Sequence, residues 1–414
     1  MPASGGPALV VTHLLNALLL TPPLPWPRTP DRRLRGACRD TPPRPRRGPL
    51  SSSLELKRLQ LKNHRNYPHL DLVPGSGVNV FIGPNGQGKT NLLEAVAMLA
   101  LSSSPRARRE IELVGPVGLA ARIDALVEAH ARRLEVSIAL QVEGDRARRT
   151  IEVDGVRRRG VDLPGNFRVT LFWPDDLGLV KAGPELRRRF LNQMLVQVEP
   201  GYARALAALR RVLEQRNSLL KRIAAGDEGS DAIEVWDQQL VAYGSEIARA
   251  RARAIAELRP EAARAHAEIA DGERLEIEYL GPPDDLAVAV QKSLGDDLRR
   301  GVTTVGPHHD DLSISLGGRE ARSYASQGQQ RTAVVSLKLA EAELVARRTG
   351  ERPVLLLDDV LSELDAERRS ALLSKVAGKG QVIVTSAEAG PFPPDLMDAA
   401  RVWTVTAGRI EACG

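Results

Sequence analysis

The segment that most constrains the fold is a glycine-rich run, residues 83–90, which fits the phosphate-binding pattern G-x-x-x-x-G-K-[ST]. It consists of Gly83, Pro84, Asn85, Gly86, Gln87, Gly88, Lys89 and Thr90. The apolar run 78–82 precedes it and predicts a buried strand, and residues 91–99 are rich in helix formers. In this order, backbone N–H groups and a helix N-terminus can surround a phosphate. The pattern therefore predicts an α/β fold that binds a nucleotide through this loop.

The last two side chains of the pattern have separate predicted tasks. Lys89 is expected to contact the β- and γ-phosphates, and the Thr90 hydroxyl is expected to bind Mg²⁺. The alternative is a chance match, since the chain holds 35 glycines. We favour the functional interpretation because the flanking strand and helix are both predicted.

A second predicted strand, residues 353–357, ends in two carboxylates, Asp358 and Asp359. Asp358 lies where P-loop nucleotide hydrolases place the carboxylate that holds Mg²⁺. The predicted metal ligands are therefore Thr90 and Asp358. Asp359 is placed to polarise the attacking water.

A third motif, residues 326–330, precedes a helix predicted over 333–348. It resembles the signature loop of ABC-type ATPases, in which a serine and a glycine at a helix N-terminus touch a γ-phosphate. Ser326 and Gly328 are the matching residues. In that class the phosphate belongs to the opposite subunit, so the resemblance implies two chains that close around two ATP molecules. Asp365 is expected across the same interface, where it would couple the two sites.

The rest of the chain divides by composition. Short alternating strands are predicted from Leu54, with a bulge or bend before residue 61, and again over 134–158, where Asp154-Gly155 signals a hairpin. From Pro184 the pattern becomes helical, with helices predicted over 185–198, 201–225 and 232–270. The predicted fold is an ABC-type P-loop ATPase head, with a mixed sheet and an antiparallel β-subdomain, into which an α-helical lobe is inserted. The predicted divisions are a disordered extension 1–52, an N-terminal ATPase part 53–183, a helical lobe 184–272 and a C-terminal ATPase part 273–414.

The N-terminal extension accounts for the basic character of the chain. Residues 28–47 hold eight arginines and two aspartates, and eight minus two equals the whole formal charge of +6. DNA binding must therefore be argued from local patches. Eleven of 28 prolines lie in the first 50 residues, which favours disorder or wrongly included upstream sequence over targeting. The apolar run 8–20 is too short to span a bilayer, and the two cysteines, Cys38 and Cys413, suggest no disulfide framework, so we expect a cytoplasmic protein.

Two polar clusters have competing interpretations. Arg65 lies in a basic cluster just before the phosphate loop, and its functional interpretation places it near the nucleotide; the alternative is a solvated strand edge. The run 308–311, His-His-Asp-Asp, suggests a metal site. Four consecutive residues of an extended chain point to alternate faces, so we do not favour metal binding there.

Taken together, the ordered motifs resemble the RecF family of DNA replication and repair proteins. The matching pieces are residues 59–67, 86–95, 174–177, 181–184, 187–191, 215–217, 306–311, 326–331 and 356–365. Three positions depart from the family pattern: His64 replaces an aromatic ring, Asn192 an aspartate and His309 an arginine.

The resemblance implies an ATP- and Mg²⁺-dependent homodimer that binds duplex DNA near single-strand gaps. It also implies cooperation with RecR and RecO in loading RecA during gap repair and the SOS response. Weak ATP hydrolysis, stimulated by DNA, is expected, because Thr385-Ser386 stand where many ABC ATPases have a histidine sensor. Two alternatives remain: an ABC-type switch that gates only protein partners, and a small-molecule P-loop kinase, which would need no signature serine.

Overall fold

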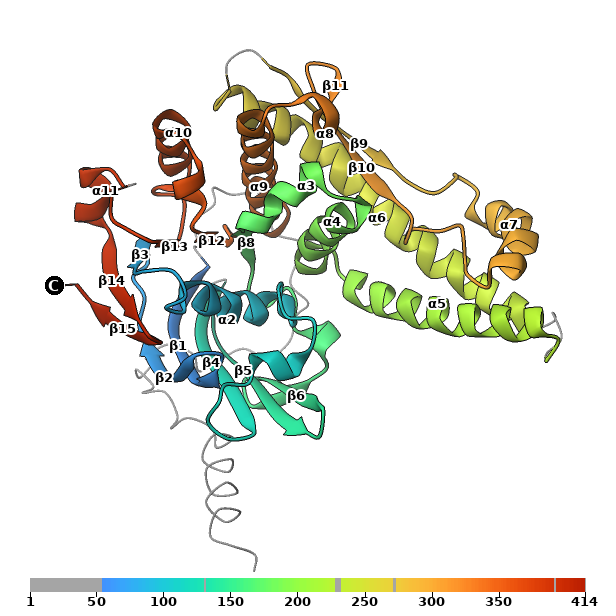
Figure 1. Ribbon diagram of the computed structural model, residues 1–414, viewed down its shortest axis with the longest axis horizontal. Coiled ribbons are helices and arrows are strands. Elements are labelled where there is room, and N and C mark those ends of the chain that lie inside the picture. Colours follow the sequence, from blue (N-terminus) through green and yellow to red (C-terminus); the bar gives the residue numbers. More distant parts are fainter. Residues whose placement is uncertain (1–53, 130–131, 228–231, 271–272, 391, 414) are drawn as a thin grey trace, which may run out of the picture.

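The structure is a computed structural model in which a helical arm extends from a body that contains two large sheets (Figure 1). The described residues are 54–413 without 130–131, 228–231, 271–272 and 391. The predictions for residues 1–52, and Cys38 with them, lie outside this part of the chain. No helix among the described residues has both the length and the apolar character to cross a membrane.

The first sheet carries the glycine loop at the carboxyl edge of its parallel strands. Its strand order is β15-β14-β3-β13-β12-β8, and every neighbouring pair is parallel except β14 with β15. The strands are β3 Val78–Ile82, β8 Val169–Phe172, β12 Val354–Asp358, β13 Val382–Ser386, β14 Arg401–Thr406 and β15 Arg409–Ala412. The strands predicted before residue 83 and before Asp358 are confirmed.

Helices cover both faces of this sheet, which explains its uninterrupted apolar strands. Phe81, Leu356 and Ile383 point to the face covered by α2 (Lys89–Leu101) and the second sheet. The alternate residues Val80 and Leu357 point to the other face, against α9 (Gln327–Thr349) and α10 (Ala366–Val376).

The second sheet is antiparallel and has the strand order β2-β1-β4-β5-β6-β7. Its strands are β1 Glu55–His64, β2 Tyr67–Leu72, β4 Ala120–Ala129, β5 Arg132–Glu143, β6 Arg146–Val153 and β7 Val156–Arg158. The predicted irregularity in β1 is confirmed as a register shift between Leu56 and Arg58. The predicted hairpin turn is confirmed as well, since Asp154 and Gly155 both have positive φ, 52° and 72°.

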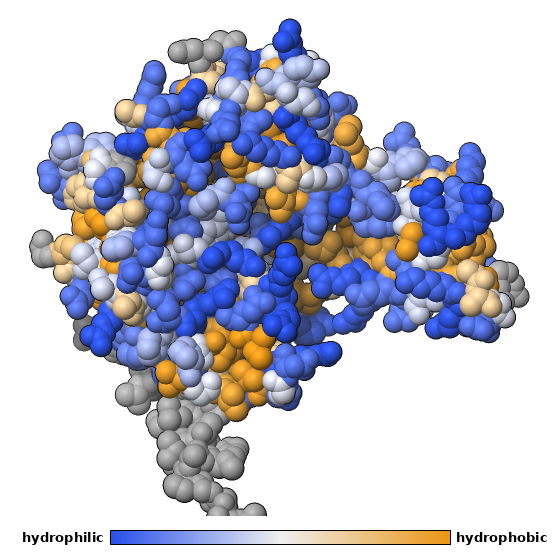
Figure 2. All heavy atoms as spheres, in the orientation of Figure 1, coloured by the Kyte–Doolittle hydropathy of each residue, from blue (hydrophilic) through white to orange (hydrophobic). Residues whose placement is uncertain are grey.

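The helical arm extends from the sheets and is formed mainly by α5 and α6, with α7 near its far end (Figure 1). Its helices are α3 Gly178–Lys181, α4 Pro184–Val198, α5 Tyr202–Ala225, α6 Ile233–Ala267 and α7 Leu286–Arg300. A small sheet, β9 (Leu275–Leu280), β10 (Asp311–Leu316) and β11 (Arg319–Glu320), packs with the arm and leads through α8 (Ala321–Tyr324) to α9. Figure 2 shows that this view of the molecule is largely hydrophilic, with apolar patches near β5 and along the arm.

One apolar core joins the arm to the helix that follows Ser326. Leu258 of α6, Leu275 and Ile277 of β9, and Leu337 of α9 all belong to it. This core contains residues from both sides of position 272, where we predicted the boundary between the helical lobe and the C-terminal ATPase part. The boundary itself stays a prediction. Helix α9 begins at Gln327 rather than at the predicted residue 333, because the Ser326 side chain caps it.

Candidate nucleotide-binding site

The glycine loop has a backbone that requires glycine at defined positions. Gly86 and Gly88 have φ values of 80° and 116° between the end of β3 and the start of α2. A Cβ on Gly88 would lie 2.6 Å from the Asn66 side chain, and one on Gly83 would lie 2.2 Å from the Val405 carbonyl oxygen. The loop is therefore held closely from outside while its N–H groups at the start of α2 remain available for an anion.

Lys89 lies inside this loop and is only 6% exposed. Its Nζ donates to the carbonyl oxygens of Gly83 at 2.5 Å and Pro84 at 3.0 Å. Burial lowers its pKa, and the nearby carboxylates of Asp359 and Asp358 act against that shift. A cation is thus placed within the curve of the loop, as the pattern predicts.

Thr90 and Asp358 meet at the carboxyl edge of the sheet, because only β13 separates β12 from β3. The Thr90 Oγ1 donates to Asp358 Oδ1 at 3.0 Å, and the Thr385 Oγ1 donates to the same oxygen at 2.8 Å. Burial raises the pKa of Asp358, and the two hydroxyl donors and Arg106 oppose the rise. A hydroxyl and a carboxylate oxygen this close together are the hard ligands that suit Mg²⁺.

Asp359 occupies an unusual backbone position beside this pair. Its φ is 52°, and its N–H donates to both the carbonyl oxygen and the Oγ1 of Thr385, at 3.2 and 3.1 Å. Its Oδ1 is buried and has no hydrogen-bond partner within the described residues. A strained backbone and an unsatisfied carboxylate oxygen are typical of a group whose partner is a ligand or a water.

Arg65 points into the protein and forms a paired contact with α2. Its Nε and Nη2 donate to the two carboxylate oxygens of Glu94 at 2.8 and 2.9 Å, and its Nη1 donates to the Glu112 carbonyl oxygen. The alternative of a solvated strand edge does not describe it, since its side chain is 21% exposed. Its placement near the nucleotide remains a prediction.

Three residues that the sequence did not single out hold the glycine loop in place. The Asn66 Nδ2 donates to the Gln87 carbonyl oxygen, and the Tyr67 hydroxyl donates to the Gly88 carbonyl oxygen, both at 2.9 Å. From the β14–β15 turn, Gly408 N donates to the Gln87 carbonyl oxygen at 3.0 Å. Asn66 and Tyr67 belong to the family-like piece 59–67, whereas the C-terminal turn gave no signal in the sequence.

The signature residues lie elsewhere in the same chain. The Ser326 Oγ accepts from Gln329 N at 3.3 Å, and Ser326 is exposed at the start of α9. A Cβ on Gly328 would lie 3.2 Å from Arg368 Nη1, and Arg368 pairs with Asp365 at 2.5 Å, so Asp365 shares this surface. Figure 1 shows α8, which ends two residues before Ser326, well apart from α2. One chain therefore does not bring Ser326, Gly328 and Asp365 to its own Lys89.

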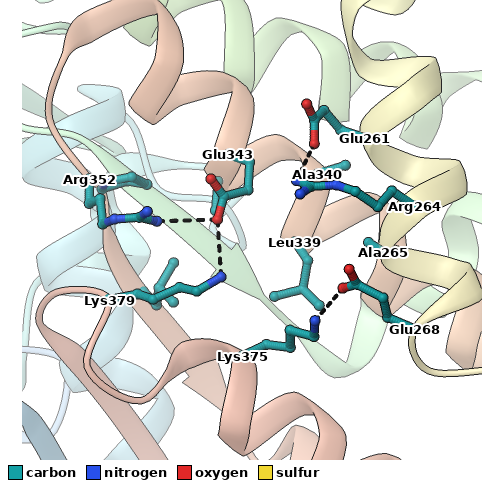
Figure 3. A pocket seen from close by; sticks show the side chains of 13 residues that line it. Glu261, Arg264, Ala265, Glu268, Leu339, Ala340, Glu343, Arg352, Lys375 and Lys379 are labelled. Carbon is teal, nitrogen blue, oxygen red and sulfur yellow. Dashed lines mark hydrogen bonds and ion pairs between the residues drawn. The ribbon is translucent and has the colours of Figure 1, made fainter. Parts of the chain in front are cut away.

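A cavity of about 270 Å³ between α6, α9 and α10 is unrelated to these residues. Figure 3 shows that its charged side chains face one another: Lys379 and Arg352 both contact Glu343, at 3.3 and 3.2 Å, and Lys375 pairs with Glu268. None of the predicted site residues lines it. We assign no ligand to it.

Glu94 gives the site a testable pH dependence. Burial raises its pKa, but the bonds from Arg65 and Ser104 outweigh this effect, so the folded-state pKa lies below 4.5. The Glu94 carboxylate therefore contributes stability above pH 4.5, and the contribution is lost as the pH falls through the folded-state value. We expect Glu94→Gln to lower the free energy of unfolding at pH 7 by about 2–3 kcal/mol, because a charged hydrogen-bond acceptor is removed.

Urea unfolding between pH 3.5 and 8 measures this effect. The deficit of the Glu94→Gln variant should shrink below pH 4.5, while the exposed Glu214→Gln on α5 should show no deficit at any pH. An equal deficit at pH 3.5 and pH 7 would contradict the electrostatic explanation.

Comparison with known proteins gives the class of this fold first. Residues 55–406 match the family described as the RecF/RecN/SMC N terminal domain. The Smc head bound to the C-winged helix domain of ScpA shares the fold, with a TM-score of 0.52 and 15% identity over 86% of this chain and 96% of that chain. The mixed sheet, the antiparallel sheet and the inserted arm thus form an ABC-type P-loop ATPase head.

Closer relatives define the family within this class. The DNA replication and repair protein RecF of Heliobacterium modesticaldum is 37% identical over 371 residues, which cover 86% of this chain and 99% of the relative. A solved structure of the recombination mediator protein RecF with ATP, in the RecFOR pathway, has a TM-score of 0.80 at 33% identity and covers 87% of this chain and 98% of that chain. The chain belongs to the RecF family of DNA replication and repair proteins.

Proposed function

We propose that this protein is an ATP-dependent DNA clamp of recombinational repair. The observation that carries the proposal is the separation of two half-sites: a complete phosphate loop with its Thr90–Asp358 pair, and an exposed, capped Ser326 elsewhere in the same chain. Each half-site lacks what the other provides, so two chains are needed for one complete site. The relative solved with ATP supports ATP as the nucleotide.

The residues divide the chemistry between two subunits. In one subunit the loop N–H groups and Lys89 hold the phosphates, and Thr90 and Asp358 would hold Mg²⁺, which supplies charge neutralisation when bound. From the other subunit, Ser326 and the start of α9 contact the same nucleotide and stabilise the closed dimer. Asp359 accepts the proton of the attacking water, and hydrolysis reopens the clamp. Slow, DNA-stimulated turnover is expected because Thr385 stands where many ABC ATPases have a histidine sensor. The Thr385 hydroxyl instead donates a hydrogen bond to Asp358.

The biological role follows the family. We propose that the closed dimer binds duplex DNA next to single-strand gaps in the cytoplasm, and that with RecO and RecR it helps load RecA. This activity would serve gap repair, replication-fork maintenance and SOS induction. The repair and RecFOR names of the relatives support this role.

Mass photometry with and without ATP tests the two half-sites. ATP should double the mass of the wild-type protein, and both Lys89→Met and Ser326→Arg should remain monomeric. Ser374→Arg on α10 adds the same charge at an exposed serine and should still dimerise. A monomeric wild type with ATP and gapped duplex DNA would overturn the composite site.

Exposed arginines on the second sheet are the candidate DNA contacts. Arg157 and Arg158 lie on the edge strand β7, both are exposed, and neither has an ion pair within the described residues. Arginine side chains that contact DNA phosphates release the counterions condensed on the DNA. We expect the double variant Arg157→Glu/Arg158→Glu to weaken duplex binding and to reduce the slope of log K against log salt by about 1–2.

Fluorescence anisotropy over a salt series measures the slope. The matched control is the adjacent exposed pair Arg210 and Arg211 on α5, changed in the same way. If both double variants lose duplex affinity equally, the DNA contacts are not specific to β7. No binding of any DNA at low salt would favour the other candidate, a switch that gates only protein partners.

A further inference from the structure

The segment 306–311 lies outside the nucleotide site but connects the arm to the signature residues. Its last residue, Asp311, begins β10, and β10 leads through β11 and α8 to Ser326. Any displacement of this segment is therefore passed along a short stretch of chain to the serine. The contacts of Asp310 and Asp311 determine where the segment lies.

Asp310 is buried, 3% exposed, at a junction of several elements. Its Oδ2 accepts from Arg251 Nη1 of α6 at 2.8 Å and from the Tyr279 hydroxyl of β9, and its carbonyl oxygen accepts from Arg188 Nη1 of α4 at 2.7 Å. Arg251 also donates to the Pro307 carbonyl oxygen at 2.6 Å and to Asn192 Oδ1 at 3.0 Å. One buried guanidinium thus joins α4, α6 and the segment.

Asp311 connects the segment to the nucleotide-binding sheet. Both of its carboxylate oxygens accept from Arg187 of α4, at 2.6 and 2.8 Å. Arg187 Nη1 also donates to the carbonyl oxygens of Leu179 and Ala182, at 3.1 and 2.9 Å, in and just after α3. The chain reaches α3 from β8, which pairs with β12, the strand that ends at Asp358. A continuous set of covalent and hydrogen bonds therefore runs from β12 to β10.

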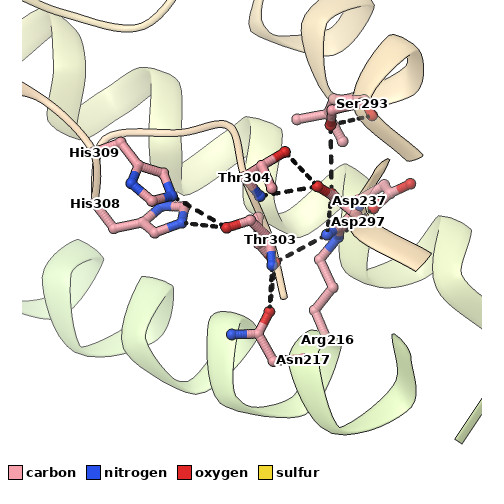
Figure 4. Close-up of polar contacts among 10 residues, drawn as sticks. Arg216, Asn217, Asp237, Ser293, Asp297, Thr303, Thr304, His308 and His309 are labelled. Carbon is pink, nitrogen blue, oxygen red and sulfur yellow. Dashed lines mark hydrogen bonds and ion pairs between the residues drawn. The ribbon is translucent and has the colours of Figure 1, made fainter. Parts of the chain in front are cut away.

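The chain just before the segment is fixed to the far part of the arm (Figure 4). Arg216 of α5, with no exposed surface, pairs with the equally buried Asp297 of α7 and donates to the Thr303 hydroxyl at 2.9 Å. The rings of His308 and His309 both contact the Thr303 carbonyl oxygen, at 3.1 and 3.2 Å. The arm and the sheet thus both contact the same nine-residue stretch of chain, residues 303–311.

We propose that Arg187 and Asp311 are positioning residues that set the place of Ser326 for closure on the partner's nucleotide. They touch neither nucleotide, and they act through β10, α8 and the start of α9. The inference rests on the proposed ATP-dependent dimer. It predicts a split between two readouts: ATP binding by the phosphate loop stays intact, and ATP-driven dimerisation is lost.

The test is a double-mutant cycle with Arg187→Lys and Asp311→Asn. Lysine keeps the charge but loses the two-pronged contact and the carbonyl bonds, and asparagine keeps the shape but loses the charge. Each single variant should weaken ATP-driven dimerisation by about 10-fold, within the usual range of coupling between sites. The double variant should be no worse than either single one, because both remove the same contact.

Nucleotide affinity is measured on each variant with a fluorescent ATP analogue at concentrations where the protein is monomeric. The matched control is Arg204→Lys with Asp162→Asn, another arginine–carboxylate pair, at 2.9 Å, which lies off this route. Two results would overturn this inference without touching the proposed function. One is that folded single variants dimerise as well as the wild type, and the other is that they lose ATP affinity as much as they lose dimerisation. A wild type that fails to dimerise would instead refute the proposed function.

Discussion

Replacing Asp359 with asparagine is expected to reduce ATP turnover by about 100-fold or more, the usual contribution of a positioned general base. The Asp359 Oδ1 is buried and unpaired within the described residues, next to the Thr90–Asp358 pair. Asparagine tolerates the left-handed backbone, φ 52°, as well as aspartate does, so the substitution removes the charge without new strain. ATP binding should be unchanged, because Asp359 holds neither phosphate nor metal in the proposed scheme.

The same variant should accumulate as closed dimers. If hydrolysis reopens the clamp, loss of the base lengthens the lifetime of the dimer with ATP and of its complex with DNA. Phosphate release measures turnover, and mass photometry after dilution measures dimer lifetime. Glu367→Gln on the exposed face of α10 is the control and should behave as wild type. Normal turnover in Asp359→Asn would assign the base to another residue.

Gly408→Ala is expected to damage both stability and nucleotide binding. An added Cβ would lie 2.0 Å from the Asn66 carbonyl oxygen, and φ at this position is 74°. The left-handed backbone alone costs about 1–2 kcal/mol for alanine, and the backbone clash adds to it. Gly408 N and Asn66 Nδ2 both donate to the Gln87 carbonyl oxygen. If the added methyl group pushes residue 408 away from Asn66, the glycine loop that they hold is displaced. We expect ATP affinity to fall by at least about 10-fold, or about 1.4 kcal/mol.

Gly226→Ala provides the matched comparison for that variant. Its φ is 81°, but nothing lies within 4 Å of the added Cβ, at the end of α5. It should lower stability by about 1 kcal/mol through the backbone term alone and leave ATP affinity unchanged. Thermal unfolding and calorimetric ATP titration distinguish the two. Equal effects would show that the contact with Asn66 is not tight in solution.

The nucleotide half-site was predictable because its determinants are local. A strand, a glycine loop and a helix follow one another directly, and Asp358 ends an apolar strand whose direction the sequence already implies. The meeting of Thr90 with Asp358 required only that β3 and β12 belong to one parallel sheet. Ser326 was recognisable by its resemblance to the ABC-type signature loop, whereas its capping contact with Gln329 was not predicted.

The parts that were missed depend on contacts distant in sequence. The strand β4 was not predicted because its Ala-, Leu- and Glu-rich composition favours a helix, and burial between β1 and β5 overrides that preference. Helix α7 was not predicted either. The β14–β15 turn contacts Gln87 across 320 positions, and Arg187 pairs with Asp311 across 124 positions. No local sequence pattern encodes contacts between residues so far apart.

The clasp on the glycine loop has a consequence for biosynthesis. Strand β3 is paired on both sides by strands synthesised about 300 positions later, and Ala407 N binds Gln87 across 320 positions. A ribosome that adds about 5–20 residues per second needs roughly 15–60 s to produce the intervening chain. A nascent chain therefore cannot assemble its nucleotide pocket until translation has passed residue 408. If the proposed ATP-driven pairing occurs, products truncated before the β14–β15 turn should not take part in it, because they lack a complete nucleotide pocket.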